Sequence, residues 1–271
     1  MLYNAKNAAV SIDGSLMEYI QFGNGKRNLV FLPGLGDGLR TVKGTAAIMA
    51  MLYRKYSANH TVYMFSRKQH ISPGSSTRDM AADLKKAMDN LEIDKADIIG
   101  VSMGGMIAQH FAADFPEAVN RLVLVVTCPY CNEKVENSIY EWLGLARSGD
   151  HRSLMGSNLK LIYSEKYYRQ NRWMLPVVGT LTKPKSYERF YRQAEACLSH
   201  DASERLAHIK APTLIIGGAK DQVLGCEASV ELNQKIAGSK VRIYPEGCHG
   251  LYEEEKDFNS FVLGFLMDET D

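Results

Sequence analysis

The feature that most constrains the fold of this chain is a serine between glycines, in the segment Gly100-Val-Ser-Met-Gly-Gly105. The residues directly before the serine, 96–101, are nearly all apolar, which is typical of a central parallel strand covered on both faces. Residues 103–114 are predicted to form a helix, which ends before Pro116. A Gly-x-Ser-x-Gly turn between a strand and a helix predicts that Ser102 is a nucleophile at the carboxyl edge of a sheet. The alternative is a Ser-Gly turn without chemistry.

Strand and helix patterns alternate along most of the chain. Besides 96–101, apolar strands are predicted at residues 9–12, 16–22, 28–32, 61–65, 121–126, 213–216 and 240–244. Further helices are predicted at residues 42–56, 77–91, 226–236 and 253–265. Because strands that alternate with helices favour parallel pairing with right-handed crossovers, the sequence predicts an α/β fold with a mainly parallel sheet.

Residues 132–208 interrupt this alternation, because they contain no clear strand pattern and are rich in aromatic residues. Helices are predicted there at residues 135–146, 151–163, 165–173 and 186–198. We interpret this segment as an all-helical insertion between two strands of the sheet. The sheet domain then comprises residues 1–131 and 209–271.

A nucleophilic serine needs a base, and the base needs an acid that orients it. His249 lies in the loop after the predicted strand 240–244, and Asp221 lies in the loop after the predicted strand 213–216. Since the carboxyl ends of parallel strands share one edge of a sheet, we expect Ser102, Asp221 and His249 to meet as a catalytic triad. An isolated aspartate in such a loop would be interpreted as a turn cap, and the shared edge favours the triad.

Stabilisation of a tetrahedral intermediate requires two backbone donors near the serine. Met103 follows the serine at a helix amino terminus, where unpaired N–H groups favour an anion. The glycine-rich loop from Leu32 to Gly38 follows the third predicted strand and can turn a second N–H toward the serine. We predict that the N–H groups of Leu35 and Met103 form the oxyanion hole.

Composition narrows the partners that we expect. The net charge is +1, and the densest basic segment, Arg67–His70, is too short to indicate nucleic-acid binding. No apolar run approaches the length of a transmembrane helix, so we expect no membrane partner. The amino terminus lacks a basic region followed by an apolar core, so we expect no signal peptide and a cytoplasmic location.

The tetrapeptide Cys128-Pro-Tyr-Cys131 matches the redox motif of glutaredoxins, but the match covers these residues alone and lies in the middle of the chain. A zinc site would need a second ligand pair of similar spacing, which the sequence lacks. We therefore expect reduced, partly buried thiols, no metal site and no cofactor.

Together these segments resemble the α/β-hydrolase superfamily, and the resemblance covers nearly the whole chain. The amino-terminal hairpin, the glycine-rich loop, the Ser102 turn, the Gly-x-x-Asp that ends at Asp221 and the Gly-x-His that ends at His249 stand in family order. The resemblance implies an eight-stranded sheet and a helical cap, or lid, formed by residues 132–208 after the sixth strand. Pro33-Gly34 departs from the His-Gly of many relatives, which leaves Gly36 as an alternative to Leu35 for the oxyanion donor.

The expected activity is two-step acyl transfer without a cofactor. His249 takes the proton of Ser102, Asp221 orients the imidazole, and water then cleaves the acyl-enzyme. The expected substrate is a small to medium, largely apolar carboxylic ester, lactone or thioester. Alternatives on the same triad are a carbon–carbon bond hydrolase and a cofactor-free perhydrolase, and a contrasting one is a non-catalytic ligand receptor. The oligomeric state stays open, with a homodimer as one alternative.

Overall fold

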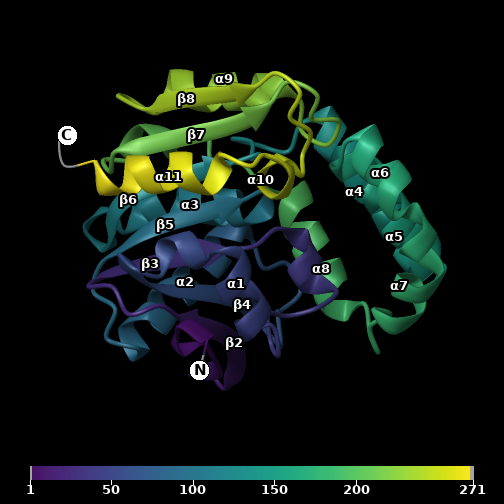
Figure 1. Ribbon diagram of the computed structural model, residues 1–271, viewed down its shortest axis with the longest axis horizontal. Helices are drawn as coiled ribbons and strands as arrows, with labels where there is room; N and C mark the ends of the chain where they lie inside the picture. The colour runs from purple at the N-terminus through teal and green to yellow at the C-terminus, as the bar shows by residue number, and fades with distance from the viewer. Residues whose placement is uncertain (1, 269–271) are drawn as a thin grey trace.

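The structure, a computed structural model, describes residues 2–268, and these contain one eight-stranded sheet (Figure 1). The strands are β1 (Lys6–Ile12), β2 (Ser15–Phe22), β3 (Arg27–Leu32), β4 (His60–Lys68), β5 (Ala96–Val101), β6 (Val119–Val125), β7 (Thr213–Gly218) and β8 (Lys240–Tyr244). They lie in the order β1-β2-β4-β3-β5-β6-β7-β8. β2 pairs antiparallel with β1 and β4, and the pairs from β4 to β8 are parallel. The predicted mainly parallel α/β sheet is confirmed.

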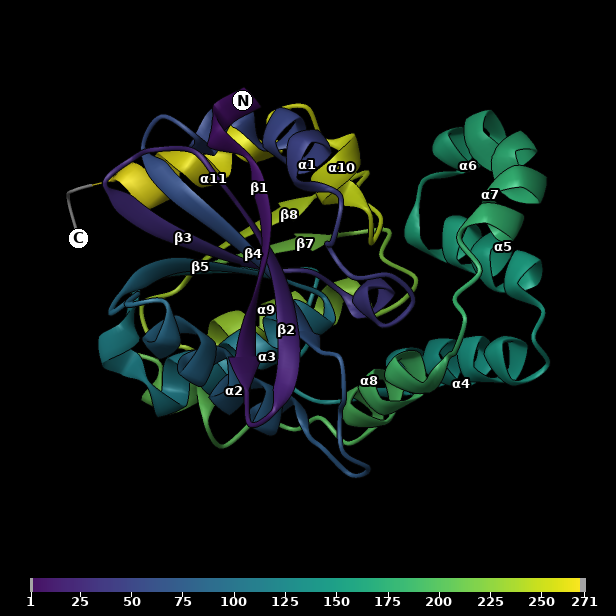
Figure 2. The same ribbon diagram turned by 90° about the horizontal axis from the view of Figure 1, so that it is seen from below.

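Helices cover both faces of the sheet (Figure 2). One face carries α1 (Ala46–Leu52), α10 (Leu251–Glu254) and α11 (Phe258–Met267), and the other carries α2 (Thr77–Asn90), α3 (Met103–Asp114) and α9 (Cys226–Lys235). Every residue of β5 is buried between these layers. This double burial explains why the strand before Ser102 is nearly all apolar.

The chain between β6 and β7 is helical, as predicted, and we call residues 132–208 the helical insertion. It contains α4 (Glu133–Arg147), α5 (His151–Ile162), α6 (Glu165–Asn171), α7 (Leu175–Leu181) and α8 (Glu188–Leu198). The side chains of Asn132, Asp150 and Ser164 cap the amino ends of α4, α5 and α6. Figures 1 and 2 show these helices beside the sheet rather than on either face. None of the described helices combines the length and hydrophobicity needed to cross a bilayer.

Two predicted helices differ from the structure in their bounds, and one helix was not predicted. The helix predicted at residues 42–56 is limited to α1 and a following 3-10 turn, because Gly44 adopts φ +81° just before it. Its large apolar side chains Ile48, Met51 and Leu52 are exposed, and small alanines face the sheet. The helix predicted at residues 253–265 is divided into α10 and α11. The sequence interpretation also missed α7, whose first turn tolerates Pro176.

His200 lies buried where the helical insertion returns to the sheet. Its Nδ1 is 2.9 Å from Thr77 Oγ1, and its Nε2 is 3.2 Å from the carbonyl oxygen of Cys128. Burial and the neighbouring His110 lower the pKa of His200 to about 3. The folded protein therefore holds this imidazole in its neutral form.

We expect this histidine to make stability fall in mild acid. The unfolded imidazole has an ordinary pKa of about 6.5, so between pH 6.5 and 3 the unfolded chain binds the additional proton. At pH 5 this linkage lowers the free energy of unfolding by about 2 kcal/mol relative to pH 7. Urea unfolding at both pH values is the measurement. His200→Gln should reduce the difference by that amount, whereas His208→Gln, at an exposed position nearby, should retain it.

Candidate active site

Ser102 lies on a sharp turn between β5 and α3. Its backbone adopts φ 53° and ψ −119°, a region that residues other than glycine rarely occupy. The flanking glycines allow the chain to approach its neighbours closely. A Cβ atom at Gly104 would lie 2.0 Å from the carbonyl oxygen of Leu32, and one at Gly100 would lie 2.6 Å from that of Gly104. The sequence pattern is therefore required by backbone contact.

Gly104→Ala is expected to destabilise the protein by about 3 kcal/mol or more, because the added methyl group overlaps rigid backbone atoms. Gly144→Ala is the matched control. Gly144 is exposed within α4, and no heavy atom lies within 4 Å of the added Cβ position. That substitution is expected to stabilise the protein by about 0.5 to 1 kcal/mol. Urea unfolding of both variants is the measurement, and equal stability of the two would contradict the steric argument.

The structure brings Ser102, His249 and Asp221 into one hydrogen-bonded chain. His249 Nε2 lies 3.0 Å from Ser102 Oγ, and His249 Nδ1 lies 2.9 Å from Asp221 Oδ2. Asp221 follows β7 and His249 follows β8, so both come from loops at the carboxyl edge of the sheet. With the proton of Nδ1 donated to the carboxylate, Nε2 is left to accept the serine proton.

Asp221 is held as a carboxylate. Its side chain is buried, and burial by itself raises the pKa of a carboxyl group. His249 and the backbone N–H groups of Val223 and Leu224 oppose this effect, and the pKa of Asp221 is lowered overall. The two N–H groups donate to Oδ1 at 2.8 and 3.0 Å. One oxygen is thus fixed by the backbone, and the other faces the imidazole.

Leu35 and Met103, the residues expected to supply the oxyanion hole, lie on either side of the serine turn. Met103 is the first residue of α3, and Leu35 begins a 3-10 turn, Leu35–Gly38. A Cβ atom at Gly34 would be 3.4 Å from Ser102 Cβ, so this loop packs directly against the serine. No described residue accepts a hydrogen bond from the N–H of Leu35 or Met103. Both donors are available to a bound oxygen.

A buried ionic cluster holds the loop that carries Leu35. Asp37 Oδ2 accepts hydrogen bonds from Arg189 Nη2 at 2.8 Å, from Gln193 Nε2 at 3.1 Å and from the backbone N–H of Arg67 at 3.1 Å. Arg189 also donates to the carbonyl oxygen of Asp37 at 2.7 Å. Because Arg189 and Gln193 belong to α8, the cluster attaches the helical insertion to the loop beside Ser102.

The helical insertion is attached again beside His249. Tyr163 donates a hydrogen bond to Glu253 Oε2 at 2.7 Å, and the backbone N–H of Ser164 donates to Glu254 Oε2 at 3.0 Å. Both carboxylates belong to α10, just after the loop that carries His249. The backbone N–H of Gly250, next to His249, also donates to the carbonyl oxygen of Ile162 at 2.6 Å, so the insertion contacts both loops that flank Ser102.

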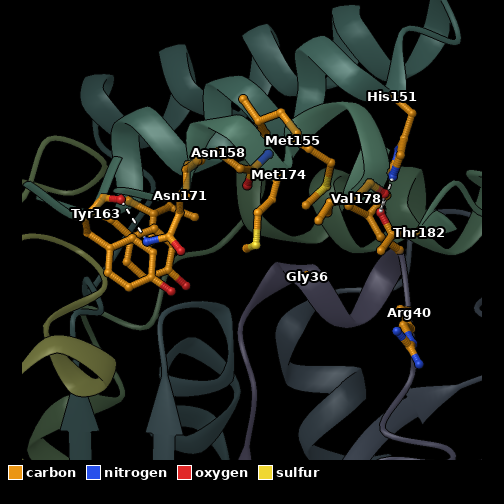
Figure 3. Close-up of a pocket in the computed structure, with 15 residues that line it drawn as sticks. Gly36, Arg40, His151, Met155, Asn158, Tyr163, Asn171, Met174, Val178 and Thr182 are labelled. Atoms are coloured by element: carbon orange, nitrogen blue, oxygen red, sulfur yellow. Dashed lines mark hydrogen bonds between the residues drawn. The ribbon is translucent and has the colours of Figure 1, made fainter. Parts of the chain in front are cut away.

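Two neighbouring cavities lie between the sheet and the helical insertion. The first, which we call the triad cavity, has a volume of about 440 Å³ and is lined by Ser102 and His249. The second, which we call the outer cavity, has a volume of about 370 Å³ and lies under α5 to α7 (Figure 3). The residues that line both cavities form their junction: Gly36, Arg40, Asn158, Ile162 and Tyr163. A ligand that reaches Ser102 has room to extend beneath the insertion.

All five cysteines are free thiols. Burial raises the pKa of Cys128 well above its usual value and raises that of Cys131 as well, so both thiols stay protonated at neutral pH. This disfavours a redox role for the Cys-Pro-Tyr-Cys segment, which depends on a thiolate. Within residues 2–268, no three His, Cys, Asp or Glu side chains form a group that could hold a metal ion.

The sequence interpretation missed the cluster around Asp37 and the junction residue Arg40. Asp37 stands between two glycines in the glycine-rich loop from Leu32 to Gly38, and a charged residue at that position was the available signal for the cluster. Arg67 belongs to the basic segment Arg67–His70, yet it is buried. Arg189, which pairs with Asp37, is distant from the loop in sequence, so no local pattern connects the two residues.

Comparison with known proteins places this chain in a family. A family model described as alpha/beta hydrolase fold matches residues 28–256. The chain is 28% identical over 263 residues to the 2-hydroxy-6-oxononadienedioate/2-hydroxy-6-oxononatrienedioate hydrolase of Klebsiella pneumoniae. The aligned region covers 90% of this chain and 88% of that protein.

Solved structures agree on the fold. An alpha/beta hydrolase from a Medee basin deep-sea metagenome library superposes with a TM-score of 0.85 at 23% identity and covers 97% of this chain and 98% of its own. The enol-lactonase of Burkholderia xenovorans superposes with a TM-score of 0.78 at 20% identity and covers 96% of this chain and all, 100%, of its own. Since the family model matches most of the sequence, the chain belongs to the alpha/beta hydrolase fold family.

Proposed function

We propose that the protein is a serine hydrolase that cleaves a small to medium, largely apolar carboxylic ester, lactone or thioester. The observation that carries the proposal is the hydrogen-bonded chain from Ser102 through His249 to Asp221, of which Ser102 and His249 line a cavity large enough for a substrate. The positive φ of Ser102 supports it, because backbone strain of this kind is retained where function requires it.

The proposed reaction uses each residue in one role. His249 Nε2 takes the proton of Ser102 as the oxygen attacks the carbonyl carbon, and Asp221 stabilises the resulting imidazolium. The N–H groups of Leu35 and Met103 bind the oxyanion of the tetrahedral intermediate. His249 then protonates the leaving alcohol or thiol. Water, activated by the same imidazole, hydrolyses the acyl-enzyme and regenerates the serine.

Esters are the first candidate class because an alkoxide leaving group needs only the proton that His249 supplies. The helical insertion would act as a lid, and its two attachments to the loops beside Ser102 support that role. Met49, Met64 and Trp142 provide apolar lining in the triad cavity. Such a lining suits a hydrocarbon acyl or alcohol group.

Carbon–carbon bond hydrolysis is the second candidate, and the curated relatives favour it. The relative from Klebsiella pneumoniae is named as a hydrolase of 2-hydroxy-6-oxononadienedioate, and a relative of the same name from Pseudomonas putida is 28% identical over 276 residues. In such a reaction the bond between the carbonyl carbon and a neighbouring carbon breaks. That neighbouring carbon must delocalise the electron pair and then accept a proton, which demands more of the substrate than an ester does.

The first experiment is to treat the protein with an alkyl fluorophosphonate and to map the added mass to a peptide. We expect labelling confined to Ser102 and absent from Ser102→Ala. Labelling absent from folded native protein would overturn the proposed function and would favour a ligand receptor.

A substrate panel then separates the two bond types. Nitrophenyl esters of increasing chain length test ester cleavage by release of the phenol. A 2-hydroxy-6-oxo-dienoate tests carbon–carbon cleavage by loss of its absorbance. The class with the higher kcat/KM identifies the reaction, and Ser102→Ala is the control for both assays.

A further inference from the structure

Arg40 is a charged side chain at the junction of the two cavities, and its guanidinium has no partner among residues 2–268. It is exposed, and no described residue forms a hydrogen bond or an ion pair with its side chain. The arginines that pair around the same loop are different, because Arg67 and Arg189 both pair with Asp37. Asp37 is thus already paired, and Arg40 remains available to an external anion.

Among the described residues that line the outer cavity, Arg40 is also the only one with a permanent charge. His151 lines the same cavity, but burial lowers its pKa, so the imidazole is neutral at neutral pH. Asn158, also at the junction, donates its amide N–H to the carbonyl oxygen of Leu154 at 2.8 Å. The electrostatic character of the junction is therefore set by one guanidinium.

The rest of the outer cavity is suited to a hydrocarbon chain. Apolar side chains from α5 and from residues 174–178 line it: Met155, Leu159, Met174, Leu175 and Val178. Figure 3 shows Met155, Met174 and Val178 on the side of the insertion, with Gly36 and Arg40 on the opposite side. One end of the cavity thus offers a cation, and its wall offers apolar surface.

We propose that Arg40 binds a carboxylate of the substrate at the junction while an aliphatic chain of the same molecule occupies the outer cavity. The substrate class is then an amphiphilic carboxylic acid that also carries the hydrolysable carbonyl group in the triad cavity. This inference rests on the proposed function, since it assigns the substrate of that same site. A guanidinium pairs with a carboxylate through two parallel hydrogen bonds, a geometry that a neutral amide cannot reproduce.

The test compares octanoate with octanamide by isothermal titration calorimetry, because the two probes differ in charge but have the same chain. We expect octanoate to bind the native protein about tenfold or more tightly than octanamide. Arg40→Gln should remove this preference. Arg172→Gln removes an equal charge from an exposed position of the insertion that does not line the cavities, and it should keep the preference.

A second pair of variants tests the place of the chain. Val178→Trp fills the outer cavity and should weaken octanoate binding about tenfold or more, whereas Val177→Trp adds the same side chain at an exposed neighbour and should not. Equal affinities for octanoate and octanamide in the native protein, absence of binding, or a preference that survives Arg40→Gln would each overturn the inference. Fluorophosphonate labelling of Ser102 does not depend on Arg40, so it reports on the proposed function separately.

Discussion

Ser102→Ala is expected to lower the kcat of hydrolysis by about 10⁴-fold or more and to leave the fold intact. The substitution removes the serine Oγ, which lies 3.0 Å from His249 Nε2. Alanine keeps the small volume that the turn between β5 and α3 requires. The measurements are kcat from steady-state assays on the best substrate of the panel, and the free energy of unfolding from urea unfolding.

A double variant makes the prediction sharper. If Ser102 and His249 act as one unit, Ser102→Ala/His249→Ala should be about as slow as either single variant, because removing one member already disables the other. If the loss of activation free energy in the double variant instead equals the sum of the losses in the two single variants, the residues act independently. Ser199→Ala, outside the triad, is the control for the loss of a serine hydroxyl.

The triad residues were predictable from the sequence because each depends on local chain signals. The nearly apolar strand 96–101 and the glycines around Ser102 identify the turn that carries the serine within one short segment. Asp221 and His249 each follow a recognisable strand, and parallel topology brings strand ends to one edge. Long-range geometry followed here from a repeated local pattern, which is why the structure brings together the residues that the sequence indicated.

The cavities and the cluster around Asp37 could not be predicted in the same way. The ion pair of Asp37 with Arg189 joins residues 152 positions apart, and Arg189 lies in no sequence motif. The lining of the outer cavity depends on how α5 to α7 lie over the loop at Gly36, which hydrophobic periodicity does not determine. Periodicity also predicted too long a helix at residues 42–56, and in α1 the large apolar residues face outward while Ala46 and Ala50 face the sheet.

Asp37→Ala is expected to lower the free energy of unfolding by about 3 to 5 kcal/mol, because it leaves the buried guanidinium of Arg67 without a counter-ion. Burial already lowers the pKa of Arg67, and the carboxylate of Asp37 is the main opposing influence. Urea unfolding is the measurement. Glu246→Ala removes a carboxylate from the exposed pair with Lys220 and should cost less than about 1 kcal/mol.

The same substitution also tests whether the ionic cluster positions the loop that carries Leu35. Asp37 follows Leu35 by two residues, and its hydrogen bonds to α8 fix the loop that packs against Ser102. We expect kcat to fall about tenfold or more in Asp37→Ala with a smaller change in KM, since oxyanion donors act in the transition state. Asp37→Ala/Arg67→Met removes both buried charges and should recover stability. If it recovers stability but not kcat, the cluster orients the loop as well as stabilising the fold; recovery of both would limit Asp37 to a structural role.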